Sequence, residues 1–150
     1  MAVSTGKVGT GVVFQVNVTV SPITWFTIAN VRSINQTGRQ ADEIDFTHLG
    51  STGSYREFRQ GFKDGGSVAI EYHFDPTEDT HVNTNGLLDL FNDGTVFDWR
   101  INFAAAGWAY GLVGRGFMSN PGDIDITVDG PITGSATVRV TGDTTIEAVV

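Results

Sequence analysis

Strict alternation of apolar and polar residues limits the fold of this chain more than any other feature. Apolar side chains occupy every even position from Val12 to Val20, with Gln15, Asn17 and Thr19 between them. The same period of two recurs over residues 67–74, 97–103 and 123–129. Successive side chains of a β-strand point to opposite faces, so this period predicts strands with one buried face.

Weaker patterns and turn residues predict the rest of the secondary structure. We expect a loop over 35–40, a turn over 119–122 and one helix that starts near Thr77 or Thr80 and stops at Gly94. That helix would bury Leu87, Leu88 and Phe91, and the last alternating strand would turn Ile124, Ile126 and Val128 inward. Further strands are expected over 24–34, 43–47, 108–118, 134–140 and 144–150. Seven to nine strands and one helix describe a mainly β chain, an antiparallel β-sandwich or barrel with one packed α-helix, in a single domain over 1–150.

Two segments do not fit this core. Residues 1–11 are expected to form a flexible N-terminal arm, because they are rich in Gly and lack an apolar stretch behind Lys7 that would suit a signal peptide. Residues 48–66 have little periodicity and are expected to form a long loop, with one helical turn near Ser54 and Glu57. Both segments would become ordered on assembly.

Composition excludes several classes of protein. The sequence contains no cysteine, so disulfides, thiolate zinc sites and cysteine nucleophiles are excluded. No window approaches the ~20 apolar residues of a membrane span, so no membrane association is expected. The formal net charge of −8 argues against a protein that binds double-stranded nucleic acid, because affinity for a duplex comes largely from Lys and Arg.

No constellation of residues predicts catalysis, a metal or a cofactor. His48, His73 and His81 have no HExxH or nearby carboxylate pattern, and no nucleophile elbow or phosphate loop occurs. The glycines at 111, 114 and 116 lie inside a predicted strand, which is the wrong context for a dinucleotide fingerprint. The spacing of Asp123, Asp125 and Asp129 on a strand is too wide for one ion. We therefore expect a non-enzyme without cofactors.

Three consecutive segments in the middle of the chain carry a recognisable pattern. Residues 41–48 read Ala-Asp-Glu-Ile-Asp-Phe-Thr-His, residues 53–66 fit G-x-Y-R-E-x-x-x-G-x-x-D-G-G, and residues 67–76 form a strand pattern that ends in Asp-Pro. In this order they resemble the a-D-x-I-D-x-T segment, the Gly-rich stretch and the following strand of the major tail tube proteins of long-tailed bacteriophages. The resemblance spans about residues 8–103 and continues through 137–142.

This resemblance implies a mechanical function. Family members form hexameric rings that stack into a hollow conduit for the genome, so the expected location is the virion tail, assembled in the host cytoplasm. The implied partners are further copies of the chain, a tape-measure protein, a tail terminator, distal tail or baseplate proteins, and DNA that passes without specific binding. An acidic lumen would repel DNA. The candidate lumen-facing acids are Glu71, Asp98, Asp123, Asp125 and Asp129, and the candidate inter-ring or inter-subunit loop residues are Tyr55, Arg56, Glu57, Phe58, Arg59, Phe62 and Lys63.

Two alternative functions stay open at this point. One is a β-sandwich module that binds carbohydrate or another ligand through Trp25, Trp99 and Trp108, although their apolar neighbours favour burial. The other is the inner-tube protein of a contractile injection system.

Overall fold

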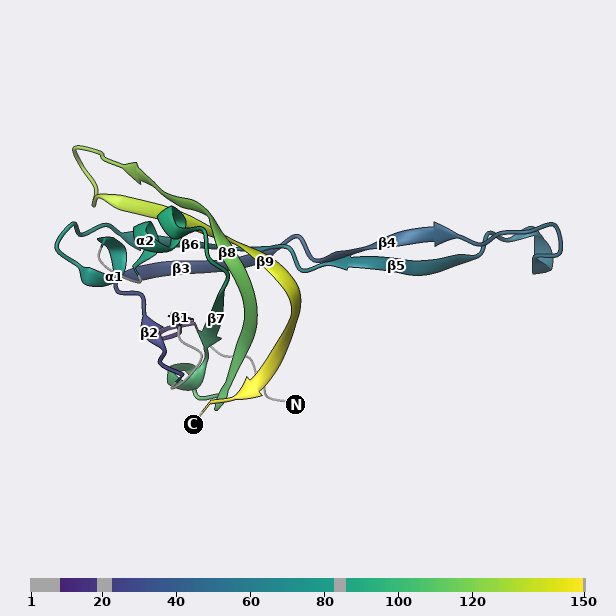
Figure 1. The fold of residues 1–150 in the computed structure, drawn as a ribbon, viewed down its shortest axis with the longest axis horizontal. Coiled ribbons are helices and arrows are strands. Elements are labelled where there is room, and N and C mark those ends of the chain that lie inside the picture. Colours follow the sequence, from purple (N-terminus) through teal and green to yellow (C-terminus); the bar gives the residue numbers. More distant parts are fainter. Residues whose placement is uncertain (1–8, 19–22, 83–85, 150) are drawn as a thin grey trace, which may run out of the picture.

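The computed structural model describes residues 9–18, 23–82 and 86–149. Figure 1 shows a β-rich body from which one long hairpin projects. The elements, in chain order, are β1 (Val13–Asn17), β2 (Phe26–Thr27), β3 (Val31–Thr37), β4 (Gln40–Asp45), a 3₁₀ turn (Thr52–Ser54), β5 (Phe58–Asp64), β6 (Ser67–His73), α1 (Asp79–Val82), α2 (Leu87–Asp93), β7 (Phe97–Asn102), a second 3₁₀ turn (Ala104–Ala106), β8 (Tyr110–Asp125) and β9 (Thr133–Ala148).

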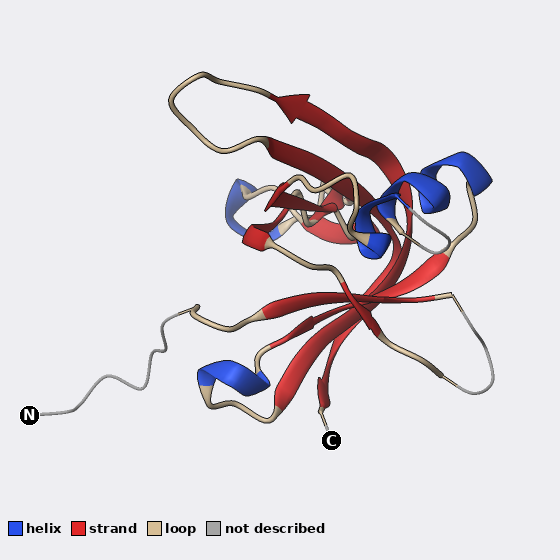
Figure 2. Ribbon diagram, turned by 90° about the vertical axis from the view of Figure 1, so that its left-hand side faces the viewer, coloured by secondary structure: helices blue, strands red, loops and turns tan. Residues whose placement is uncertain are grey.

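Seven of the described strands form one antiparallel sheet in the order β2-β1-β7-β8-β9-β6-β3. β8 and β9 are 16 residues each, and they curve from one layer of the fold into the other (Figures 1 and 2). A register shift where Gly114 faces Thr144 and Arg115 faces Thr141 puts a bulge at this bend. The predicted mainly β fold is confirmed.

The core lies between the two layers. Phe14, Trp99 and Ile101 come from one layer, Ile70 and Val138 from the other, and all are buried. The Phe14 and Trp99 rings stack with their centroids 6.4 Å apart. These are the inward positions of the alternating runs, so the period of two correctly predicted the core of β1, β6 and β7.

Gly114 makes room for the largest core residue. A Cβ atom at this position would lie 2.7 Å from Cζ2 of Trp99. A Cβ atom at Gly111 or Gly116 would be crowded in a similar way, so close packing accounts for these three glycines of β8.

The helical region differs from the single helix that the sequence predicts. It holds two short helices, α1 and α2, while residues 83–85 lie outside the described part of the chain. The stop at Gly94 is confirmed: its φ is 65°, and its N–H donates to the carbonyl of Leu90. Leu87 and Leu90 are buried, whereas Leu88 and Phe91 are 42% exposed, so the predicted apolar stripe is wrong at two positions.

Residues 40–64 form a hairpin. The strand expected over 43–47 is present as β4, whereas the loop expected over 48–66 contains strand β5. β4 and β5 pair antiparallel, with Gln40 opposite Asp64 and Asp45 opposite Phe58. The hairpin, here called the arm, extends well beyond the body in Figure 1. Near Ser54 the chain makes a 3₁₀ turn, and the helical turn expected after Ser54 is absent from the described structure. Strand β5 escaped the sequence analysis because its pattern is broken by Gly61 and by a register shift.

Three other boundaries were predicted wrongly. The strand expected over 24–34 is divided into β2 and β3 by Asn30, whose φ is 61°. The turn expected over 119–122 is a bulged part of β8, and the two final strands are one continuous β9. In the last two cases cross-strand pairing overrode local turn chemistry, which sequence reasoning cannot see.

The end of β8 is also unlike the prediction. Ile124 lies on the inner face of β8, as predicted, because it pairs with Gly134, which faces buried Tyr72. It is nevertheless 51% exposed, and Ile126 and Val128 are 71% and 101% exposed, so none of the three is buried in the core. β8 ends at Asp125, and the chain then forms a loop before β9 begins at Thr133. The expectations for residues 1–8 lie outside the described residues.

Candidate interaction surfaces

The arm exposes apolar side chains on both of its faces. Ile44 and Phe46 share one face with Arg59, because Ile44 lies opposite Arg59 and alternate residues share a face. Phe58 lies on the other face, opposite Asp45. Ile44, Phe46 and Phe58 are each about half exposed, at 46%, 48% and 53%. A two-stranded hairpin is marginally stable by itself, so an arm with two apolar faces is built to be covered.

Charged groups are distributed along the same hairpin. The Arg59 guanidinium carbon lies 4.9 Å from the centroid of the Phe46 ring. Arg56 pairs with Asp45 at 3.9 Å. Hydrogen bonds from Thr47 lower the pKa of the Asp45 carboxyl below its ordinary value. Most of these groups are exposed, so they contribute little to stability and remain available for contacts.

A network of polar contacts joins the arm to the sheet. Nη2 of Arg139 in β9 lies 2.6 Å from Oδ2 of Asp64, and its Nη1 donates to the carbonyl of Gly66 at 2.9 Å. The hydrogen bond from Arg139, followed by one from the Gly66 N–H, lowers the pKa of Asp64. From strand β3, Nε2 of Gln36 donates to the carbonyl of Gly65 at 3.1 Å. These contacts set the angle at which the arm leaves the body.

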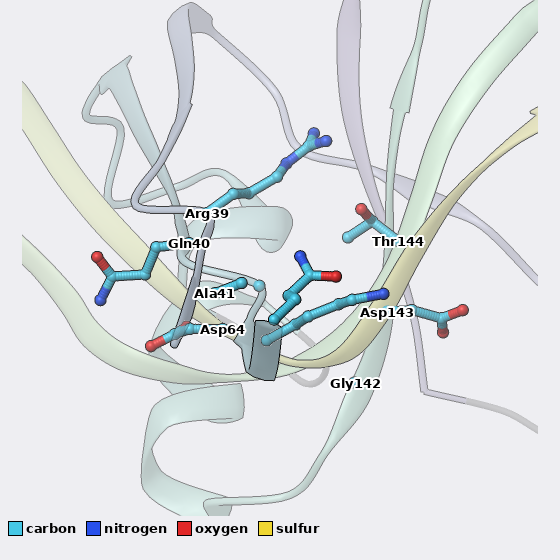
Figure 3. A pocket seen from close by; sticks show the side chains of 10 residues that line it. Arg39, Gln40, Ala41, Asp64, Gly142, Asp143 and Thr144 are labelled. Carbon is cyan, nitrogen blue, oxygen red and sulfur yellow. The ribbon is translucent and has the colours of Figure 1, made fainter. Parts of the chain in front are cut away.

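A hollow of about 570 Å³ lies beside this junction. Figure 3 shows its wall built from Arg39 and the start of β4 (Gln40, Ala41), the end of β5 (Asp64) and the β9 bulge (Gly142, Asp143, Thr144). The hollow brings no nucleophile together with a histidine base, since it is lined by no His, Ser or Cys. It marks the space between the arm and the body.

The five predicted lumen acids separate into three groups. Glu71 in β6 pairs with Arg32 at 3.3 Å, and Asp98 in β7 pairs with Arg115 at 3.0 Å. Asp123 and Asp125 lie at the far end of β8, and Asp129 lies in the loop beyond it.

The outward face of the sheet brings two of these acids into line. Ser135 in β9 faces both Glu71 in β6 and Asp123 in β8. All three are therefore on the same face, which is opposite to the face that buries Ile70 and Val138. Outward neighbours on this face include Ser67 and Thr137, so the surface is polar and rich in small side chains.

An apolar groove of about 850 Å³ opens between the two layers. Its walls include Val31 and Ile34 of the edge strand β3 and, across from them, Phe103, Trp108 and Leu112. The described chain begins at Gly9 in the same wall. An apolar groove at a sheet edge is a second surface suited to contact with another protein chain.

The three tryptophans do not form a stacking platform. Trp99 is fully buried, and Trp108 makes an edge contact with Phe103 at 6.2 Å. Trp25 lies under the guanidinium of Arg100, whose carbon is 4.4 Å from the ring centroid. Burial in the core is thus correct for Trp99, while Trp25 and Trp108 contact separate neighbours.

The three histidines lie in different surroundings. His48 and His73 are exposed, and His81 is buried, with Nε2 2.8 Å from the carbonyl of Ala29 and Nδ1 accepting from the Asp75 N–H at 3.3 Å. Within the described ranges, no group of three or more His, Asp or Glu side chains is arranged to hold a metal ion. The described helices are too short to cross a membrane.

Sequence reasoning missed several residues of these surfaces. Ile44 and Phe46 were read only as part of a short strand, and their exposure follows from the arm's distance from the core. Arg32 and Arg115, which neutralise Glu71 and Asp98, gave no sequence signal because the partners are far apart along the chain.

Comparisons of structure find the same fold in tail and injection particles. The tail of an empty gene transfer agent particle, refined with C6 symmetry, has a chain with a TM-score of 0.74 and 20% identity, covering 95% of this chain and 100% of that chain. The chain of the SPP1 tail tube has a TM-score of 0.62 and 13% identity, and the match covers 95% of this chain and 80% of that chain. A chain of the sheath-tube complex of an extracellular contractile injection system has a TM-score of 0.60 and 11% identity, and the match covers 92% of this chain and 88% of that chain.

Comparisons of sequence give a family. No curated protein sequence matches the chain. The family profile described as "Lambda phage tail tube protein, TTP" matches residues 8–147, which include the body, the arm and both long strands. The chain therefore belongs to the lambda phage tail tube protein family.

Proposed function

We propose that this protein is the structural subunit of a bacteriophage tail tube, in which hexameric rings stack into a hollow conduit for genome delivery. The family match over residues 8–147 carries this proposal. The C6 symmetry of the similar gene transfer agent tail supports six subunits per ring. The protein's place is then the virion tail, and its work is mechanical rather than catalytic.

The arm is proposed to join one subunit to another. It presents the predicted contact residues Tyr55, Phe58 and Phe62, which are 78%, 53% and 90% exposed, together with the charged residues Arg56, Glu57, Arg59 and Lys63. Burying these aromatic side chains against a neighbour would stabilise an assembly by about 25 cal/mol for each Å² of apolar surface removed from water.

The outward face of the sheet is proposed as the lumen wall. Glu71, Asp123 and Asp125 lie on this face. Asp98 is left out because it lies on the outward side of the other layer, in β7, and Asp129 is left out because it lies beyond the end of β8. Since Arg32 pairs with Glu71, the uncompensated negative charge is concentrated at Asp123 and Asp125. Like charge within a Debye length of ~8–10 Å would keep DNA from binding to the wall.

This assignment of the wall predicts a defect in transport. Asp123→Asn and Asp125→Asn, made singly, should each leave tube assembly intact and slow genome ejection, because the wall would repel DNA less strongly. Asp93→Asn, at the exposed end of α2, is the control of equal charge change. Ejection kinetics that are the same in all three variants would contradict the assignment.

The partners follow from the proposed tube. Further copies form the walls, and a tail terminator is proposed at one end, in keeping with the similar fold found in the terminating cap of an anti-feeding prophage. A tape-measure protein inside the growing tube and distal tail or baseplate proteins at its other end are proposed from the family alone. DNA is a passing cargo in this proposal.

Electron microscopy of the purified, concentrated protein tests the proposed function. Negative-stain images should show hollow rings or tubes with six subunits per turn, and light scattering should rise with incubation. A chain that stays monomeric at every concentration, even with tail initiator proteins added, would contradict the proposal.

A contractile injection tube is the second candidate, because its chains share this fold at TM-scores of 0.60 to 0.67. The genes beside this one separate the two: a tape-measure gene with capsid genes supports a phage tail, and sheath genes without capsid genes support an injection system.

A further inference from the structure

The arm and the end of the β8–β9 hairpin lie at opposite ends of the same strands. The arm enters and leaves the sheet where Thr37 pairs with Ser67. At the far end of β6, His73 pairs with Thr133, and Thr133 pairs with Asp125. Residues 126–132, here called the distal tip, connect these last two strands, and Figure 1 shows them pointing away from the arm. A second copy shifted along the strand direction would bring the arm of one molecule to the distal tip of the next.

The distal tip is apolar and acidic. Ile126, Val128 and Ile132 are 71%, 101% and 43% exposed. Between Arg115 and Arg139 the sequence contains three aspartates and no lysine or arginine. Asp129 is exposed and forms no ion pair with any described residue. Three exposed aliphatic side chains around an unpaired carboxylate require a partner of complementary composition.

One face of the arm has that composition. Ile44 and Phe46 supply exposed apolar surface, and the Arg59 guanidinium lies over the Phe46 ring. Arg59 forms no ion pair with any described carboxylate. A guanidinium held over an aromatic ring keeps N–H groups available for a carboxylate from outside, with less side-chain freedom to lose on binding.

We infer that the arm of one copy binds the distal tip of the next copy, with Arg59 paired to Asp129 and with Ile44 and Phe46 packed against Ile126 and Val128. This inference rests on the proposed function and names the receiving surface of the arm. The two patches differ, so the contact is heterologous, and repeating it along the strand direction gives an open-ended filament. Apolar burial supplies affinity, and the charge pair fixes the register.

Charge reversal tests the pairing in trans. Arg59→Glu alone places two carboxylates against each other at the junction, and Asp129→Arg alone places two guanidinium groups there. Each variant should therefore lose tube formation or raise the threshold concentration about tenfold or more. A mixture of the two variants allows junctions with opposite charges, and the double variant in one chain restores them at every junction. We expect tubes from both, as measured by light scattering and negative-stain microscopy.

Matched controls keep the outcomes distinct. Arg56 lies on the same arm but pairs with Asp45, so Asp129→Arg should not restore tube formation to Arg56→Glu. Circular dichroism checks that each variant is folded. The neutral variants Arg59→Gln and Asp129→Asn supply a second measurement. Added salt should raise the threshold concentration at which the wild type forms tubes, because salt screens the charge pair. In each neutral variant this threshold concentration should no longer depend on salt.

The possible results separate the inference from the proposed function. If the wild type forms tubes and Arg59→Glu or Asp129→Arg does so equally well, or if neither the mixture nor the double variant gives rescue, the pairing is wrong and the tube function stands. If the wild type forms no tubes even with initiator proteins, the proposed function itself fails.

Discussion

Gly66 is the position where a single methyl group should detach the arm from the sheet. Its φ is +77°, a conformation that costs a residue with a side chain about 1–2 kcal/mol. A Cβ atom there would overlap the carbonyl oxygen of Thr37 and lie 2.7 Å from the carbonyl carbon of Gly38. Both contacts are with backbone, which cannot rotate away.

The expected cost of Gly66→Ala follows from these contacts. Besides the strain, the overlap forces a shift of backbone, for which overpacking costs of about 1–3 kcal/mol are typical. That shift weakens the hydrogen bond of 3.0 Å from the Val140 N–H to the Gly66 carbonyl, worth about 1 kcal/mol. We expect a loss of about 3–5 kcal/mol in the free energy of unfolding.

Gly142→Ala is the matched control. Gly142 has nearly the same φ, +82°, but a Cβ atom there would meet nothing within 4 Å. Only the strain remains, so the loss should be about 1–2 kcal/mol. Urea unfolding, followed by the fluorescence of buried Trp99, measures both variants, and limited proteolysis reports whether the arm is released. Equal losses for the two alanine variants would refute the role of the Thr37 and Gly38 backbone.

Three further predictions test the packing of the body. His81→Phe should lower the free energy of unfolding, measured in urea, by about 2–4 kcal/mol. The Ala29 carbonyl and the Asp75 N–H, which bond the buried imidazole, would lose their partner. Leu90→Ala should lower it by about 2–4 kcal/mol, since this side chain is 2% exposed, whereas Leu88→Ala, 42% exposed, should change it little. The pKa of Asp64 is lowered by Arg139, so the contact at the base of the arm should persist above the ordinary value of 3.8 and be lost as pH falls below it; proteolysis of the arm at low pH, with Asp64→Asn as reference, measures this.

The candidate surfaces were only partly predictable from sequence. Tyr55, Arg56, Phe58 and the other residues of the predicted contact loop lie on the projecting arm, which the sequence did not predict, and their contacts with other subunits stay a prediction. Their exposure on two faces of a hairpin was not predictable, because it depends on how far the strands extend beyond the core.

The acids illustrate a second limit. Charge counting treated Glu71 and Asp129 alike, but Glu71 is paired with Arg32, whereas Asp129 forms no ion pair with any described residue. Partners that are distant along the chain, as Arg32 and Glu71 are, meet only when β3 and β6 pair.

The sequence by itself determined what short-range physics controls. Alternation selected the strands around Phe14, Ile70 and Trp99 and the faces that they bury, and Gly94 determined where α2 stops. The tertiary structure alone decided how far each strand continues and what it faces. β8 runs through Pro121 to Asp125 because pairing with β9 outweighs the local turn signals. Ile126 and Val128, in the loop that follows, are exposed because no element of the described body covers that end. Pairing between distant strands is a non-local energy, so only the folded chain could show where its surfaces for assembly lie.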